Sequence, residues 1–175
     1  MNKVIFLDID GVLNSDKWHD SEQAQIAHNC LNTRKDLDKL PYELLYGSMI
    51  DPNALKLLQE IVDKTGADIV ISSTWRKGGR LENIKNLLKG LGFTGNIIGA
   101  TPVLPSNYHC RGSEIKKWII NNIEDISNFR YVILDDDNDM LAEQCYRFVC
   151  VDGGVGLDEN DVLLATSILN WRSIL

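Results

Sequence analysis

The sequence has few cysteines, no long apolar run and no surplus of basic residues. Its four cysteines form no CxxC pair, which argues against a zinc knuckle and a disulfide framework. We expect them to be small buried side chains in a reducing compartment. No stretch approaches the roughly 20 apolar residues of a membrane span. The first apolar run is interrupted by two aspartates, unlike a signal peptide. We therefore expect a soluble, cytoplasmic protein.

Acidic residues outnumber basic ones by 25 to 18, and the formal net charge is -7. A field of this sign does not attract nucleic acid or anionic lipid, so we expect neither membrane binding nor nonspecific duplex binding. The surplus is uneven, because residues 51–117 carry more basic than acidic side chains. Two acidic clusters end apolar runs, where carboxylates are costly unless something pairs with them.

The order of apolar patterns predicts an α/β fold. A length of 175 residues with 44% hydrophobic and 25% charged residues is typical of one globular domain, here residues 1–175. Continuous apolar runs predict buried strands at 3–8, 68–72, 96–99, 131–134 and 148–151. Amphipathic helices alternate with them, and we expect helix caps at Asp51, Ser113 and Asp158. This alternation predicts a parallel five-stranded sheet with helices on both faces, a three-layer Rossmann-like arrangement.

One polar segment, residues 14–50, interrupts the alternation and is called the insert below. It has no clean periodicity, and a loop of this length is usually functional or partly folded. Four leucines in its second half predict one short helix: Leu37, Leu40, Leu44 and Leu45.

Carboxylates follow two of the predicted strands. Asp8 and Asp10 come after the first strand, and Gly11 permits a bend that turns both toward one site. One of the two can be a nucleophile and the other a general acid and then a general base. Asp135 and Asp136 follow a later strand, and the carboxyl ends of parallel strands share one edge of the sheet. The four groups form an all-oxygen set suited to Mg²⁺.

Further polar residues at element ends could hold a phosphate. The candidates are the hydroxyl of Ser72 or Ser73, backbone N–H groups after Thr74, and the Arg111 cation. Taken singly, each feature has a structural interpretation, since Asp-Gly turns, serine caps and surface arginines are common. Their occurrence together, in this order, favours a phosphate site.

Four segments resemble the motifs of the haloacid dehalogenase-like (HAD) phosphohydrolase superfamily. In chain order they are FLDIDGVLN, IVISSTWR, RGSEIKKWI and VILDDDND, and the resemblance covers essentially the whole chain. The first and fourth motifs are the specific ones. The resemblance implies the HAD Rossmann-like sheet with strand order 5-4-1-2-3. It also implies that the insert is a small flap, or minimal cap, after the first strand.

The resemblance also implies roles for residues of the first three motifs. Asp8 matches the nucleophile and Asp10 the acid/base, which favours a phosphatase over a dehalogenase. Ser73 matches the phosphate-binding hydroxyl, with Ser72 as the one-residue alternative. Arg111 stands where lysine is usual, with Lys116 or Lys117 as alternatives.

The fourth motif implies the metal ligands. Asp136 would bind Mg²⁺ directly, and Asp135 would bind it directly or through water. The nucleophile Asp8 and the backbone carbonyl of Asp10 would complete the set.

The small insert and the pair Trp75-Arg76 bear on the substrate. A minimal cap implies an open site, and the WR pair resembles HAD domains linked to RNA-end repair. Trp75 could stack a base and Arg76 could hold a flanking phosphate, so a nucleotide or a phosphorylated nucleic-acid end is the expected substrate. Alternatively, Trp75 packs under the flap and Arg76 pairs with an acid. The other functions considered are a non-catalytic module that binds a phosphorylated partner, a sugar or metabolite phosphatase, and a phosphomutase, which would need a closing cap.

Overall fold

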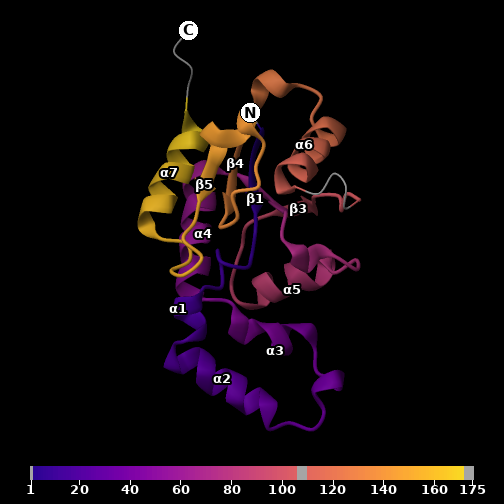
Figure 1. The fold of residues 1–175 in the computed structure, drawn as a ribbon, viewed down its shortest axis with the longest axis vertical. Helices are drawn as coiled ribbons and strands as arrows, with labels where there is room; N and C mark the ends of the chain where they lie inside the picture. The colour runs from indigo at the N-terminus through magenta and orange to yellow at the C-terminus, as the bar shows by residue number, and fades with distance from the viewer. Residues whose placement is uncertain (1, 106–109, 172–175) are drawn as a thin grey trace.

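A computed structural model describes residues 2–105 and 110–171, and a five-stranded sheet lies at its centre (Figure 1). All neighbouring strands pair in parallel, in the order β3-β2-β1-β4-β5. This is the predicted order read from the other edge. The strands are β1 (Asn2–Leu7), β2 (Asp68–Ile71), β3 (Ile97–Ala100), β4 (Phe129–Asp135) and β5 (Phe148–Cys150).

Helices cover both faces of this sheet, which confirms the predicted three-layer α/β class. They are α4 (Pro52–Thr65), α5 (Leu81–Gly90), α6 (Arg111–Asn122) and α7 (Glu159–Asn170). Alternate side chains of a strand point to opposite faces. Ile5 and Leu7 of β1 enter the core that includes α4, α5 and α7, whereas Phe6 meets Trp118 of α6, with ring centroids 5.4 Å apart. Figure 1 shows α4 and α7 on one side of the strands and α6 on the other.

Two of the three predicted helix caps are confirmed. The Asp51 carboxylate begins α4 by accepting a hydrogen bond from the backbone N–H of Asn53. Asp158 begins α7 as part of a reciprocal capping box. The prediction for Ser113 is wrong, because α6 begins three residues earlier. Cys110 is its cap, and its sulfur accepts a hydrogen bond from the Ser113 N–H at 3.4 Å.

The insert contains more helix than the predicted single short one. Its helices are α1 (Asp16–His19), α2 (Glu22–Asn32) and α3 (Tyr42–Tyr46). The predicted short helix is present, since Leu44 and Leu45 lie in α3. The other two helices are begun by local capping: Ser15 caps α1 and Ser21 caps α2 through their hydroxyls. The helices lie beyond the carboxyl ends of the strands, at the lower end of Figure 1.

Backbone hydrogen bonds hold the base of the insert. The two residues that flank the insert are bonded to each other, because the backbone N–H of Asp51 donates to the carbonyl of Leu13 at 2.7 Å. Near its beginning, the N–H of Lys17 donates to the carbonyl of Gly154, in the loop after β5, at 3.0 Å. The insert is therefore closed at its base and bonded to the core near its beginning.

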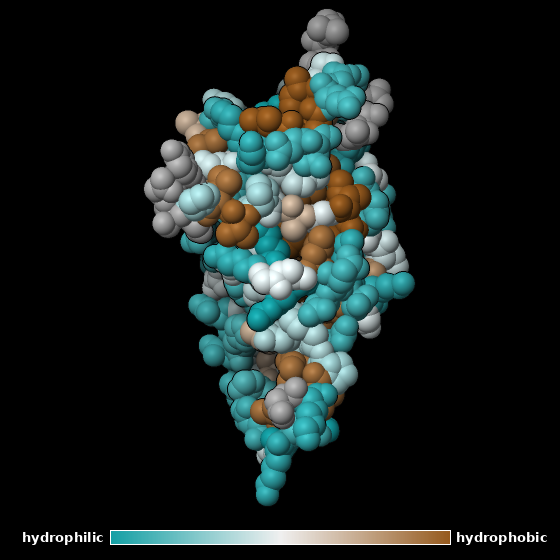
Figure 2. Space-filling model, turned by 90° about the vertical axis from the view of Figure 1, so that its right-hand side faces the viewer, coloured by the Kyte–Doolittle hydropathy of each residue, from teal (hydrophilic) through white to brown (hydrophobic). Residues whose placement is uncertain are grey.

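The surface of the face that carries α5 and α6 is shown in Figure 2. Its narrow lower end, where the insert lies, is mostly hydrophilic, and hydrophobic residues gather in the upper half. Over the described residues, no helix is both long and apolar enough to cross a bilayer.

The prediction that the cysteines are buried is wrong. Cys30, Cys145 and Cys150 are exposed free thiols, and Cys110 is half-buried. Their positions explain this, because Cys30 lies on α2, which buries only Ala24, and Cys150 lies on the edge strand β5.

Candidate active site

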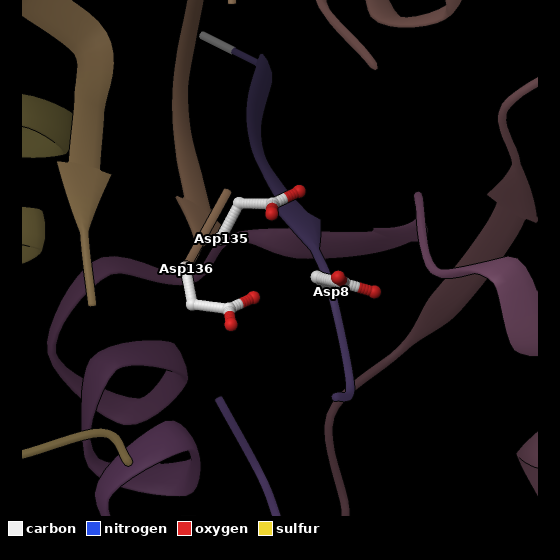
Figure 3. Close-up of side chains that lie close together, drawn as sticks. All are labelled: Asp8, Asp135 and Asp136. Atoms are coloured by element: carbon white, nitrogen blue, oxygen red, sulfur yellow. The ribbon is translucent and has the colours of Figure 1, made fainter. Parts of the chain in front are cut away.

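Three carboxylates meet at the carboxyl ends of β1 and β4. The register pairs Leu7 with Leu134, so the residues that follow, Asp8 and Asp135, lie side by side. One oxygen from each of Asp8, Asp135 and Asp136 lies within 4.8 Å of the others (Figure 3). Asp8 is 4% exposed and Asp135 is 0% exposed, whereas Asp136 is more accessible. The structure thus brings together Asp8 of the first motif with Asp135 and Asp136 of the fourth.

Burial makes this cluster unfavourable as a set of free anions. It raises the pKa of Asp135 to about 7, and the neighbouring charge of Asp8 adds to the effect. Burial also raises the pKa of Asp8 and of Asp136. Three crowded carboxylates with raised pKa values need a cation to be fully ionised at neutral pH.

Arg111, the first residue of α6, is a cation of this cluster. Its guanidinium lies 3.4 Å from an Asp8 oxygen and 3.3 Å from an Asp135 oxygen, and its side chain is 9% exposed. Of the three candidate cations it is the one at the cluster, because Lys116 pairs with Glu143 at the surface and Lys117 is exposed. The Nη1 atom of Arg111 is buried, and no residue described here is hydrogen-bonded to it.

Two glycines leave room for the Asp136 carboxylate. Gly11 has φ of 70°, and a Cβ there would lie 2.2 Å from an Asp136 oxygen. A Cβ on Gly153, in the loop after β5, would lie 2.7 Å from the same oxygen. Gly11 was expected at the site and Gly153 was not. A sequence signal for Gly153 exists, because the turn residues Asp152, Gly153 and Gly154 directly follow the apolar run 148–151. This places them at the same edge of the sheet as Asp8 and Asp135.

The polar residues after β2 reach the same edge. Ser72 and Ser73 are both fully buried. Hydrogen bonding by the Ser73 hydroxyl lowers the pKa of Asp8, against the larger effect of burial, so this hydroxyl lies at the Asp8 carboxylate. The Ser72 hydroxyl makes no hydrogen bond within the described chain. Thr74 is exposed at the start of a short 3-10 turn, Thr74–Arg76.

The Asp10 carboxylate has its own set of partners. The indole N–H of Trp75 donates to both of its oxygens, at 2.9 and 3.0 Å. The Asn14 amide donates to one of them at 3.0 Å and accepts from the backbone N–H of Gly11 at 3.0 Å. Within the described residues, Asp10 is not one of the three clustered carboxylates. The sequence did not point to Asn14, and it left two alternatives for Trp75, stacking on a base of the substrate or packing under the flap. The contact of Trp75 with Tyr46 of the insert agrees with the second alternative.

Arg76 is not available for substrate in this structure. Its guanidinium forms a buried ion pair with Glu114 and donates to the backbone carbonyls of Ser72, Ser73, Thr101 and Pro102. A guanidinium has five N–H donors, and these five contacts use all of them. The alternative interpretation, that Arg76 pairs with an acid, is the one the geometry agrees with. Glu114 lies one helical turn after the start of α6, and the sequence alone could not identify it as the partner of Arg76.

Comparison with known proteins agrees with the motifs and the strand order. Neither the curated proteins nor the solved structures yield a match to this chain. A family model described as the HAD domain in Swiss Army Knife RNA repair proteins matches residues 4–162. That range runs from β1 into α7 and contains every residue discussed at the site. The chain therefore belongs to this RNA-repair-associated family of the HAD superfamily.

Proposed function

We propose that the chain is a Mg²⁺-dependent phosphomonoesterase that removes phosphate from a nucleotide or an RNA end through an aspartyl-phosphate on Asp8. The observation that carries the proposal is the division of the carboxylates into two groups. Asp8 lies beside Arg111 in a metal-type cluster, whereas Asp10 is held apart by neutral donors. A nucleophile and a proton donor need these different surroundings.

The residues of the cluster fit Mg²⁺. They offer hard oxygen donors, the set this ion prefers. One Asp135 oxygen, Oδ2, is buried and accepts no hydrogen bond from any described residue, and the Arg111 Nε atom lies 3.3 Å from it. Asp8, Asp135 and Asp136 would hold the ion, and the Asp10 backbone carbonyl remains a predicted further ligand. When bound, the ion supplies positive charge that offsets the carboxylates and the incoming phosphate.

The chain's own residues supply the other steps. An Asp8 oxygen attacks phosphorus, and the bond from phosphorus to the leaving oxygen breaks while Asp10 gives that oxygen a proton. Asp10 then takes a proton from water, which attacks the aspartyl-phosphate and frees both phosphate and Asp8. Arg111 and the Ser73 hydroxyl, both at Asp8, would bind the phosphate oxygens.

Residues near the site support a nucleotide-like substrate. Tyr42 and Tyr46 of α3 stack with ring centroids 4.3 Å apart, and Tyr46 packs edge-on against Trp75. Burial raises the pKa of Tyr42 and the charge of Arg80 lowers it, so this exposed arginine lies near the aromatic pair. Aromatic rings beside a cation suit a base and a neighbouring phosphate. The matched family's association with RNA repair agrees with this choice.

The first experiment measures phosphate release from an aryl phosphate with and without Mg²⁺. Asp8→Asn should abolish turnover and leave the fold intact by circular dichroism. Asp63→Asn removes an exposed carboxylate on α4 and should have no effect. Normal turnover by Asp8→Asn would show that the assignment of the nucleophile is wrong.

A second experiment separates the candidate substrates. Oligoribonucleotides with a terminal phosphate, free nucleotides and sugar phosphates are compared by kcat/KM. Equal values for sugar phosphates and oligoribonucleotides would remove the support for a nucleic-acid end. Tight binding of the oligoribonucleotide without turnover would favour a non-catalytic binding module.

A further inference from the structure

The exposed Asp10 carboxylate is hydrogen-bonded by Trp75 through both of its oxygens. The Trp75 N–H lies 2.9 Å from one Asp10 oxygen and 3.0 Å from the other, so it bridges both. The Asn14 amide holds one of these oxygens from a second side. A carboxylate fixed by donors at two places cannot rotate freely about its terminal torsion, which is otherwise broad.

Trp75 is in turn supported by the insert. Its ring is half-buried against the core, and its centroid lies 5.5 Å from that of Tyr46 at an interplanar angle of 62°. Tyr46 belongs to α3, which packs against α5 of the core. One indole therefore links the turn after β2, the carboxylate after β1 and the insert.

We propose that Trp75 is a positioning residue for Asp10, and that Tyr46 buttresses Trp75 in this role. This inference rests on the proposed function of Asp10 as proton donor to the leaving oxygen. In that step, the O–H bond of protonated Asp10 breaks and the proton moves to the leaving oxygen. The electron pair remains on the carboxylate, which the Trp75 N–H stabilises by a hydrogen bond.

The tryptophan orients the Asp10 carboxyl group through a neutral N–H and adds no charge beside it. Its ring is held in place by the core and by Tyr46.

The test compares two phosphomonoesters with different leaving groups. An alkyl phosphate has a poor leaving group and depends on the general acid, whereas p-nitrophenyl phosphate has a good one and depends on it little. Trp75→Phe keeps the ring against Tyr46 and removes the N–H. We expect kcat/KM for the alkyl ester to fall at least about tenfold more than for the aryl ester, a part of the roughly 10²–10⁴ that general acid catalysis contributes.

Trp18→Phe is the matched control. Its indole N–H also makes one hydrogen bond in the insert, to the carbonyl of Ser48 at 3.0 Å, away from Asp10. This variant should change kcat/KM for both esters by the same factor. An equal loss for both esters in Trp75→Phe, or no loss, would overturn the positioning role.

The contribution of Tyr46 is tested by a double-mutant cycle. Tyr46→Leu alone should lower kcat/KM for the alkyl ester more than for the aryl ester, and the selective loss should be smaller than that of Trp75→Phe. The double variant should lose no more than Trp75→Phe alone, since both changes act on the same contact. Additive losses would refute the buttress. If the wild type releases no phosphate from either ester, the proposed function itself fails; a uniform effect of Trp75→Phe on an active enzyme overturns only this inference.

Discussion

Replacing Asp135 with asparagine should stabilise the metal-free protein at alkaline pH. The pKa of this buried carboxyl is about 7, whereas the value in an unfolded chain is near the ordinary 3.8. Between about pH 4 and about pH 7 the folded state therefore holds a proton that the unfolded state has lost. The stability that this proton maintains is complete below the lower value and is lost as the pH rises through about 7. Asparagine has no proton to lose, so its advantage grows over the same range.

The size of the effect follows from the shift. A rise from 3.8 to about 7 corresponds to a ceiling of about 4 kcal/mol, at about 1.4 kcal/mol per pKa unit. Arg111 loses one of its two carboxylate partners in the variant, which offsets part of this gain. We therefore expect a net stabilisation of about 2 kcal/mol at about pH 8, or a Tm higher by about 4–8 °C. At about pH 4 the two proteins should differ little.

The assay is thermal unfolding in a chelator at several pH values, followed by the same series with Mg²⁺. Wild type should gain stability from the ion, and Asp135→Asn should gain much less because a ligand is missing. Asp137→Asn, an exposed neighbour of the same charge, is the control and should show no comparable pH dependence. The reasoning is refuted if the stability of Asp135→Asn relative to wild type does not rise between about pH 4 and about pH 8, or if Asp137→Asn shows the same rise.

Two further predictions concern residues that hold the site in shape. Gly153→Ala should weaken the Mg²⁺ dependence of both activity and Tm, because its Cβ would lie 2.7 Å from an Asp136 oxygen. Gly154→Ala is the control. Equal Mg²⁺ affinity in both variants would contradict the role of Gly153 in leaving room for Asp136. Glu114→Gln should lower the free energy of unfolding by about 3–5 kcal/mol in urea titrations, because it leaves the buried Arg76 cation without its charged partner. Activity per folded molecule should change little, whereas a rise in KM with unchanged stability would mean that Arg76 binds substrate after all.

The sheet and the position of the carboxylates could be predicted from the sequence. Strands buried on both faces appear as continuous apolar runs, so the residues that follow them, Asp8 and Asp135, are expected at one edge. The caps Asp51 and Asp158 depend on neighbours two or three residues away, and local patterns predict such contacts well.

Contacts between distant segments could not be predicted. Trp75 meets Asp10 across 65 residues of sequence, and Arg76 meets Glu114 across 38. Trp75-Arg76 has the same local pattern whether its side chains face solvent or the interior, and only the folded chain distinguishes the two. Helices α1 and α2 of the polar insert could not be predicted for another reason. Capping serines such as Ser21, and not an apolar stripe, mark where they begin.

The two attachments of the insert have a consequence for how substrate enters. A lid that swings needs linkers free to change their backbone angles. Here Asp51, the cap of α4 directly after the insert, is hydrogen-bonded to Leu13, and Lys17 of α1 is hydrogen-bonded to Gly154. We therefore expect no hinge at either end, and the insert should act as a stationary wall whose shape is the same before and after each turnover. The end of a long polymer could enter along this wall and leave again without a lid-opening step.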